Sequence, residues 1–213
     1  MAAPESEKIT LDLLEPAMTR RRARWAGVAS LLVGAALGGV VGLLGGRMAG
    51  LLAAVAVAVP LLLLTWGESR RRVWLSGQHV SVRVLGTRVV DLHALAMLDL
   101  VVTDTRGTRV VGLLVRGGPK GKTINVALAS YAGTGGRELG VFALRRLADV
   151  LAGAGEPRAL VYSELLVAQL RAEARGEPAP GRPLFQLASV VPPGKLARRL
   201  HPDAVTRFVA TLG

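Results

Sequence analysis

An apolar run from Trp25 to Trp66 constrains this chain more than any other feature, because Arg47 is the only charged residue in it. A bilayer core of roughly 30 Å needs about 20 helical residues, and the run is about twice that long. Residues 45–47, Gly-Gly-Arg, interrupt it near the middle, where glycine permits a tight turn. The run therefore predicts a transmembrane hairpin with helices at 25–44 and 48–66.

Charge predicts the orientation of this hairpin. Arginines cluster in residues 20–24 and 70–72, outside both ends, whereas Arg47 stands alone at the turn. By the positive-inside rule both ends lie in the cytoplasm, with residues 1–24 forming a cytoplasmic segment. Trp25 and Trp66 are then the expected anchors at the cytoplasmic membrane interface. The sequence predicts a multi-pass protein of the bacterial cytoplasmic membrane with both termini inside the cell.

Small residues recur every four positions along the first helix, at Gly34, Gly38, Gly42 and Gly46. Lipid tails do not drive helices together, so helix pairs in a bilayer depend on close van der Waals packing of small residues. We assign these four glycines to helix packing. The stripe either packs the first helix on the second or joins copies into a homo-oligomer, and the first interpretation is favoured without excluding the second.

From residue 73 the hydrophobic pattern alternates, which is typical of strands. Strands are predicted within 73–92, near 98–103 and 108–115, and across 122–130, with tight turns between them. Residues 136–155 then become helical, and Gly153 is the expected stop. Short strands joined by tight turns favour an antiparallel meander, so the predicted fold class is α+β, a curved antiparallel sheet or barrel closed by an amphipathic helix.

This order of elements resembles a known family. Two membrane helices, a basic junction, the strand pair VWLSGQHVSVRVLGTRVVDL, further strands and a closing helix are similar to the membrane-anchored bacterial pleckstrin-homology-like (PH-like) domain proteins. The resemblance covers about 25–154 and implies a cytoplasmic PH-like domain at 73–154 that serves binding or assembly, without a general catalytic activity. An excess of arginine over lysine, with abundant alanine and glycine, resembles the composition of actinobacterial proteins.

The rest of the chain lies outside that resemblance. Residues 155–176 predict an additional helix, and EPAPGRP at 177–183 is typical of a Pro-rich linker. The linker opens the segment 177–213, whose tail ends in a short helix begun by Asp203. The apolar residues of that helix could dock on the domain or on a partner.

Two glycine-rich segments invite a ligand-binding interpretation. RGGPKGKT at 116–123 ends like a phosphate-binding loop, but Arg116 replaces the required first glycine and a strand-like segment follows. A basic hairpin turn is favoured, and Arg116, Lys120 and Lys122 become candidates for contact with an anion or a lipid headgroup. In the second segment, AGTGGRELG, a flexible lead-in to the next helix is favoured over an anion site formed by Arg137 and the helix N-terminus. Arg137 is kept as a further anion candidate.

Composition limits the remaining function classes. The chain has no cysteine, and its three histidines are widely spaced, so the sequence predicts no metal site, no cofactor and no catalytic group. The net charge of +12 is better explained by anionic lipid than by nucleic acid, because the arginines cluster at the membrane junctions. The sequence thus favours a non-enzymatic membrane protein whose cytoplasmic domain binds a protein partner or anionic lipid headgroups. The alternative is a nucleotide- or anion-dependent regulator or enzyme acting through 116–123.

Overall fold

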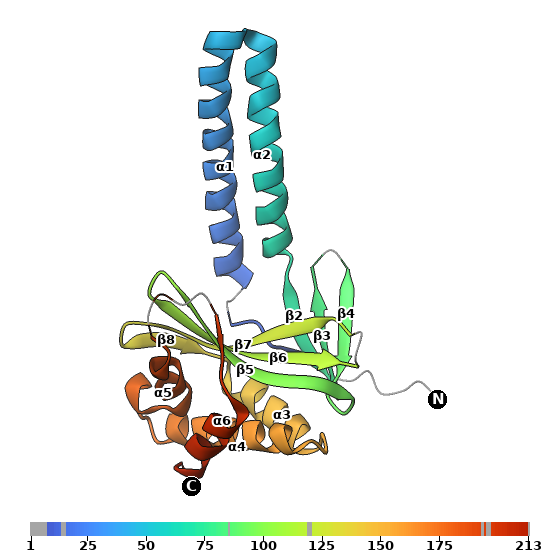
Figure 1. Ribbon diagram of the computed structural model, residues 1–213, viewed down its shortest axis with the longest axis vertical. Helices are drawn as coiled ribbons and strands as arrows, with labels where there is room; N and C mark the ends of the chain where they lie inside the picture. The colour runs from blue at the N-terminus through green and yellow to red at the C-terminus, as the bar shows by residue number, and fades with distance from the viewer. Residues whose placement is uncertain are drawn as a thin grey trace. The chain divides into compact units, whose positions relative to one another are not determined.

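The computed structural model describes residues 8–13, 16–84, 86–118, 121–192, 194 and 197–212. The chain divides into two compact units (Figure 1). The first is an α+β domain formed by the N-terminal segment to Leu13, residues 72–82, and the chain from Thr87 onward. The second is a helical hairpin, Leu14–Arg71, to which residues 83–86 also belong.

The hairpin consists of α1 (Pro16–Gly45) and α2 (Arg47–Ser69). Gly46, between them, has a φ of +87°, a left-handed conformation that glycine adopts without strain. The stretches Trp25–Gly45 and Arg47–Leu64 are long and apolar enough to cross a membrane, and few of their side chains are buried. The first helix begins well before the predicted residue 25, because arginine is a good helix former and the basic segment continues the helix.

The α+β domain contains two sheets. The first has the strand order β1-β2-β3-β4 and the second the order β8-β7-β6-β5-β9, in which every neighbouring pair is antiparallel. The first sheet comprises β1 (Lys8–Thr10), β2 (Arg72–Ser76), β3 (His79–Arg83) and β4 (Thr87–Asp91). The second comprises β5 (Leu95–Thr105), β6 (Thr108–Gly117), β7 (Thr123–Ala132), β8 (Gly135–Glu138) and β9 (Arg198–Arg199).

Strand β1 is an element that the sequence analysis did not anticipate. It pairs antiparallel with β2, Lys8 opposite Ser76, and the Leu11 amide donates to the Val73 carbonyl at 2.9 Å. Ile9 and Leu11 alternate with polar neighbours and are buried. The chain segments on the two sides of the apolar hairpin are therefore hydrogen-bonded neighbours in one sheet.

Four helices lie on one side of the five-stranded sheet (Figure 1). They are α3 (Val141–Ala152), α4 (Pro157–Ala174), α5 (Pro183–Val190) and α6 (Pro202–Ala210), with a short 3-10 helix η1 (Ala179–Gly181) before α5. The core between sheet and helices is aliphatic. Leu100, Leu113, Leu144, Leu147 and Leu165 are fully buried in it. The chain thus combines two apolar helices with an antiparallel sheet-plus-helix domain, as the sequence predicts at this level.

Two expectations about the domain differ from the structure. Residues 135–138 form strand β8 rather than the start of a helix, because the Leu139 amide donates to the Leu128 carbonyl at 2.8 Å and so continues the pairing with β7. Residues 177–183 are not a plain linker, because they contain η1 and lead into α5, and the tail after them packs on the domain, which was one of its two expected docking sites. Leu184 and Leu187 of α5 are buried, and β9 pairs with β5, so this segment completes the domain.

Candidate functional site

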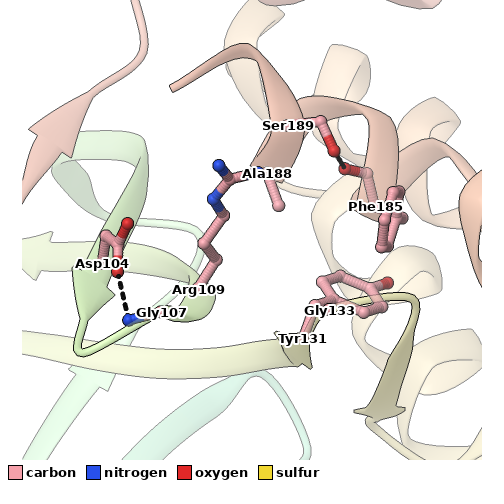
Figure 2. A pocket seen from close by; sticks show the side chains of 8 residues that line it. All are labelled: Asp104, Gly107, Arg109, Tyr131, Gly133, Phe185, Ala188 and Ser189. Carbon is pink, nitrogen blue, oxygen red and sulfur yellow. Dashed lines mark hydrogen bonds between the residues drawn. The ribbon is translucent and has the colours of Figure 1, made fainter. Parts of the chain in front are cut away.

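A pocket of about 240 Å³ lies in the domain between two hairpin turns and helix α5 (Figure 2). The turns are those that join β5 to β6 and β7 to β8. The pocket is lined by Asp104, Gly107, Arg109, Tyr131, Gly133, Phe185, Ala188 and Ser189.

The register of the strands brings together the residues that line this pocket on the side of the sheet. Asp104 lies opposite Arg109 across β5 and β6, and Arg109 lies opposite Tyr131 across β6 and β7. Residues directly opposite each other in an antiparallel ladder project from the same face. A carboxylate, a guanidinium and a phenol ring are thereby placed in one row, although they are far apart in sequence.

Turn geometry closes one side of the pocket. Arg106 and Gly107 have φ values of +52° and +77°, the pattern of a two-residue type I′ hairpin turn. Gly133, the first residue of the second turn, has a φ of +60°. Both turns are tight, so Asp104 and Tyr131 lie near the ends of their strands, where they line the pocket.

An aromatic contact fixes the helix over the sheet. The rings of Tyr131 and Phe185 are 5.1 Å apart and inclined at 75°, an edge-to-face arrangement (Figure 2). Gly136, opposite Tyr131 on β8, makes room for this ring, because a Cβ there would collide with the ring and lie 2.8 Å from the Ser130 carbonyl oxygen. This aromatic contact is therefore one of the interactions that position α5 on the sheet.

A polar chain behind the pocket holds Tyr131 and α5 in place. The Tyr131 hydroxyl donates to Glu138 Oε1 at 2.7 Å, and Arg182 Nη1 donates to Glu138 Oε2 at 2.5 Å. Arg182 directly precedes α5, and its Nε also donates to the Glu177 carbonyl at 2.8 Å. Burial, and then the hydrogen bond to Glu138, raises the pKa of Tyr131, while the hydrogen bond to Glu138 raises the pKa of Arg182. The tyrosine therefore remains neutral at physiological pH.

Arg109 differs from the other pocket residues in having an unused charge. Within the residues that the structure describes, its guanidinium takes part in no hydrogen bond or ion pair, and it lies beside Ala188 (Figure 2). Asp104, although close, is already engaged by backbone donors: Oδ1 accepts from the Gly107 amide at 3.2 Å and Oδ2 from the Gly194 amide at 3.3 Å. The pocket thus offers a guanidinium with all its donors available.

The basic residues predicted from sequence lie at the other end of β6. Arg116 is opposite Thr123 in the β6–β7 hairpin, and Lys122 is exposed just before β7. Lys120 lies outside the described residues. Strand β7, not a helix, follows this turn, so the segment lacks the helix N-terminus that a phosphate-binding loop requires. Arg116 and Lys122 remain surface candidates for anion contact.

Arg137 does not occupy the position expected for it. It lies on β8 opposite Ser130, and α3 begins only at Val141. The structure does not place Arg137 at a helix N-terminus, because the residues around it continue the sheet. Its role in anion contact stays a prediction.

The predicted membrane residues fall within the hairpin. A Cβ on Gly34 would lie 2.8 Å from the Ala58 Cβ, and one on Gly38 would lie 2.6 Å from the Ala54 Cβ. Gly42 faces the Cα of Gly50 across the same seam. Gly46 is a correction: a Cβ on it would meet nothing within 4 Å, and it forms the turn, so it does not pack helices. Trp25 is 68% exposed, and the Trp66 side chain lies outside the described part of the chain.

Sequence reasoning missed the residues that form the pocket. Asp104, Arg109 and Tyr131 belong to no local motif, and only the strand register brings them together. Two signals were available: the Arg-Gly dipeptide at 106–107, a hairpin-turn signature, and the placement of Tyr131 immediately before a second glycine turn. Pairing the strands from these turns would have put Arg109 beside Tyr131.

Comparisons with known proteins do not identify a function for this site. No protein family, curated protein or solved structure matches this chain. Among the described residues, no group of three or more His, Asp or Glu side chains is placed to hold a metal ion. The pocket can hold an anion beside Arg109 and an apolar group beside Phe185 and Ala188.

Proposed function

We propose that this chain is a non-enzymatic integral protein of the bacterial cytoplasmic membrane that presents a PH-like domain to a protein partner on the cytoplasmic side. The pairing of β1 with β2 is the observation that carries the topology. β1 precedes α1 and β2 follows α2, yet Lys8 lies opposite Ser76 in one sheet. A segment that crosses the bilayer between two paired strands must cross it an even number of times, because the strands lie on one side.

The side of the membrane follows from charge. The arginines at 20–24 and 70–72 flank the hairpin where it joins the domain in sequence, and Arg47 is the lone cation at the turn. The positive-inside rule then puts the domain in the cytoplasm. In this topology the turn at Gly46 faces outward.

A binding role is supported by the chemistry of the domain. Antiparallel sheets with helices packed on one side agree with the PH-like resemblance, and such domains serve binding or assembly. The Tyr131 hydroxyl, which belongs to the pocket, donates its hydrogen bond to Glu138. Its raised pKa makes it a poor proton-transfer group at neutral pH. The pocket is therefore better suited to hold a ligand than to transform one.

A protein partner is favoured over a lipid, because the hairpin already fixes the domain at the membrane and makes lipid affinity partly redundant. Self-association through the glycine stripe is less favoured. Gly34 and Gly38 already lie against Ala58 and Ala54 of α2, which leaves this face inside the hairpin.

The topology is tested by cysteine accessibility, since the chain has no native cysteine. Arg47→Cys and Lys122→Cys place single thiols at two exposed positions. In intact cells, after removal of any outer barrier, a membrane-impermeant maleimide should label position 47 and should reach position 122 only after lysis. Labelling of position 122 in intact cells would refute the proposed topology.

The binding role needs a separate measurement. The full chain is purified from native membranes after in-cell crosslinking, alongside a variant in which the Tyr131–Glu138–Arg182 chain is broken by Glu138→Ala. A partner retained by the wild type and lost by a folded variant would support the proposal. Recovery of lipid alone, with liposome binding that depends on Lys122, would instead favour the headgroup-binding alternative.

A further inference from the structure

Arg109 is the cationic residue among those that line the pocket, and this position sets it apart from the other arginines of the domain. Arg182 pairs with Glu138, and both Arg158 and Arg199 lie within 4 Å of Asp99. Arg109 has no such partner within the described chain, although its guanidinium lines a pocket. A guanidinium has five N–H donors in a planar fork, which matches a carboxylate or a phosphate group.

The charge balance of the pocket favours a singly charged ligand. Asp104 and Arg109 are the charged residues among those that line it, and no ion pair joins them. The two Asp104 oxygens accept backbone N–H groups from Gly107 and Gly194, which hold this side chain in the pocket wall. A dianionic phosphate on Arg109 would be repelled by this carboxylate more strongly than a monoanion would.

The size and the wall of the pocket limit the rest of the ligand. Its volume of about 240 Å³ is below the range of roughly 300–1,000 Å³ for drug-sized ligands and corresponds to about eight water molecules. Phe185 and Ala188 give it an apolar wall opposite the sheet. A body the size of one amino-acid side chain fits this space.

We propose that this pocket binds the carboxylate of a small, partly apolar ligand, with Arg109 as the bidentate anchor and Phe185 with Ala188 as the apolar wall. The same chemistry is offered by a free carboxylic acid and by the C-terminal residue of a polypeptide. This inference deepens the proposed binding function. It rests on one part of that proposal, namely that the domain binds a ligand. It does not depend on the orientation of the hairpin in the membrane.

The test measures ligand binding to the purified full-length chain in detergent by saturation-transfer NMR and calorimetry. The probes are benzoate, N-acetyl-leucine, the peptide Ala-Ala-Ala-Ala-Leu, the amides of all three, and inorganic phosphate. We expect the acids to bind at least about tenfold more tightly than their amides, because the amide removes the charge that Arg109 recognises. Preference for benzoate identifies a free acid as the source, and preference for the peptide identifies a polypeptide terminus.

Matched variants tie any binding to the pocket. Arg109→Gln should weaken acid binding about tenfold or more, and Arg109→Lys, which keeps the charge without the fork, should be intermediate. Arg106→Gln is the control. Arg106 carries the same charge as Arg109 and lies in the turn between β5 and β6, but it does not line the pocket. Circular dichroism establishes that each variant is folded.

Three outcomes would overturn the inference. Acids and amides could bind alike, Arg109→Gln and Arg109→Lys could both bind like the wild type, or phosphate could bind as tightly as the acids. A failure of the membrane topology would leave all these binding ratios unchanged, so the two proposals fail separately.

Discussion

In the apolar hairpin Gly38 lies on an ordinary helical backbone, whereas in the α+β domain Gly107 has a φ of +77°. The hairpin needs glycine for its missing side chain, because a Cβ on Gly38 would lie 2.7 Å from the Gly50 carbonyl oxygen. The domain needs glycine at this turn for its backbone freedom, and a Cβ on Gly107 would meet nothing within 4 Å. The same residue thus supports close approach in one region and chain reversal in the other.

The contrast extends to the forces that hold each region together. Helices α1 and α2 approach each other through small residues, with Gly34 and Gly38 against Ala58 and Ala54. In the domain, α5 is attached by a buried carboxylate that joins a tyrosine and an arginine. Mutations should therefore affect the two regions by different mechanisms.

The largest effect is expected from Glu138→Ala in the domain. The Glu138 side chain is 8% exposed, and its loss leaves Arg182 without its carboxylate and the Tyr131 hydroxyl without its acceptor. Removal of one member of such a pair costs about 3–5 kcal/mol of unfolding free energy. Denaturant unfolding of the full chain in detergent, followed through tertiary structure, measures the loss.

Arg175→Ala is the matched control for this prediction. Arg175 pairs with Glu177 at 2.7 Å, but its side chain is 62% exposed, so the change should cost no more than about 1 kcal/mol. Equal losses for Glu138→Ala and Arg175→Ala would mean that the buried chain does not hold α5 to the sheet.

The next effect concerns the hairpin. Gly38→Leu forces a side chain against the Ala54 Cβ and the Gly50 carbonyl and should separate the helices, at a cost of about 1–3 kcal/mol. Gly39→Leu is the control, since a Cβ on Gly39 has no neighbour within 4 Å. Disulfide crosslinking between cysteines placed on α1 and α2 reports the separation. If both leucine variants crosslink like the wild type, the stripe is not a packing seam.

The two regions also differ in how far the sequence predicts them. The hairpin is encoded locally: hydropathy gives its length, and the four-residue spacing of Gly34, Gly38 and Gly42 gives its packing face. The predicted start of the first helix at residue 25 was less accurate, because α1 begins at Pro16 and the charged segment before Trp25 continues the helix.

The pocket is encoded non-locally, which explains why sequence analysis overlooked it. Asp104, Arg109 and Tyr131 become neighbours through strand register, and Phe185 joins them only because α5 packs on the sheet. The search for compact motifs instead selected Arg116 and Lys122, which lie in one turn. β1 was missed because it is three residues long, although the alternation of Ile9 and Leu11 with polar residues was visible.

The smallest expected effect is a loss of stability at alkaline pH. It concerns the domain and not the hairpin, because both tyrosines of the chain are in the domain. Burial raises the pKa of Tyr131 and of Tyr162 above the ordinary value near 10. Because the pKa values are higher in the folded protein, the unfolding free energy keeps its full value below about pH 10, where the tyrosines are protonated in both the folded and the unfolded chain. Above that pH the unfolded chain ionises first, so stability falls as pH rises toward the folded-state values.

Absorbance of tyrosinate tests this expectation in the full-length protein in detergent. The native protein should show little tyrosinate just above pH 10, whereas the denatured chain should ionise both residues near that pH. Tyr131→Phe leaves Tyr162 as the only reporter and should halve the absorbance change on unfolding at this pH. The unfolding free energy of the wild type should fall over the same interval, while crosslinking within the hairpin should not change.

Free ionisation of both tyrosines in the native protein near pH 10 would show that neither hydroxyl is buried, and would remove the reason for regarding Tyr131 as a fixed wall of the pocket.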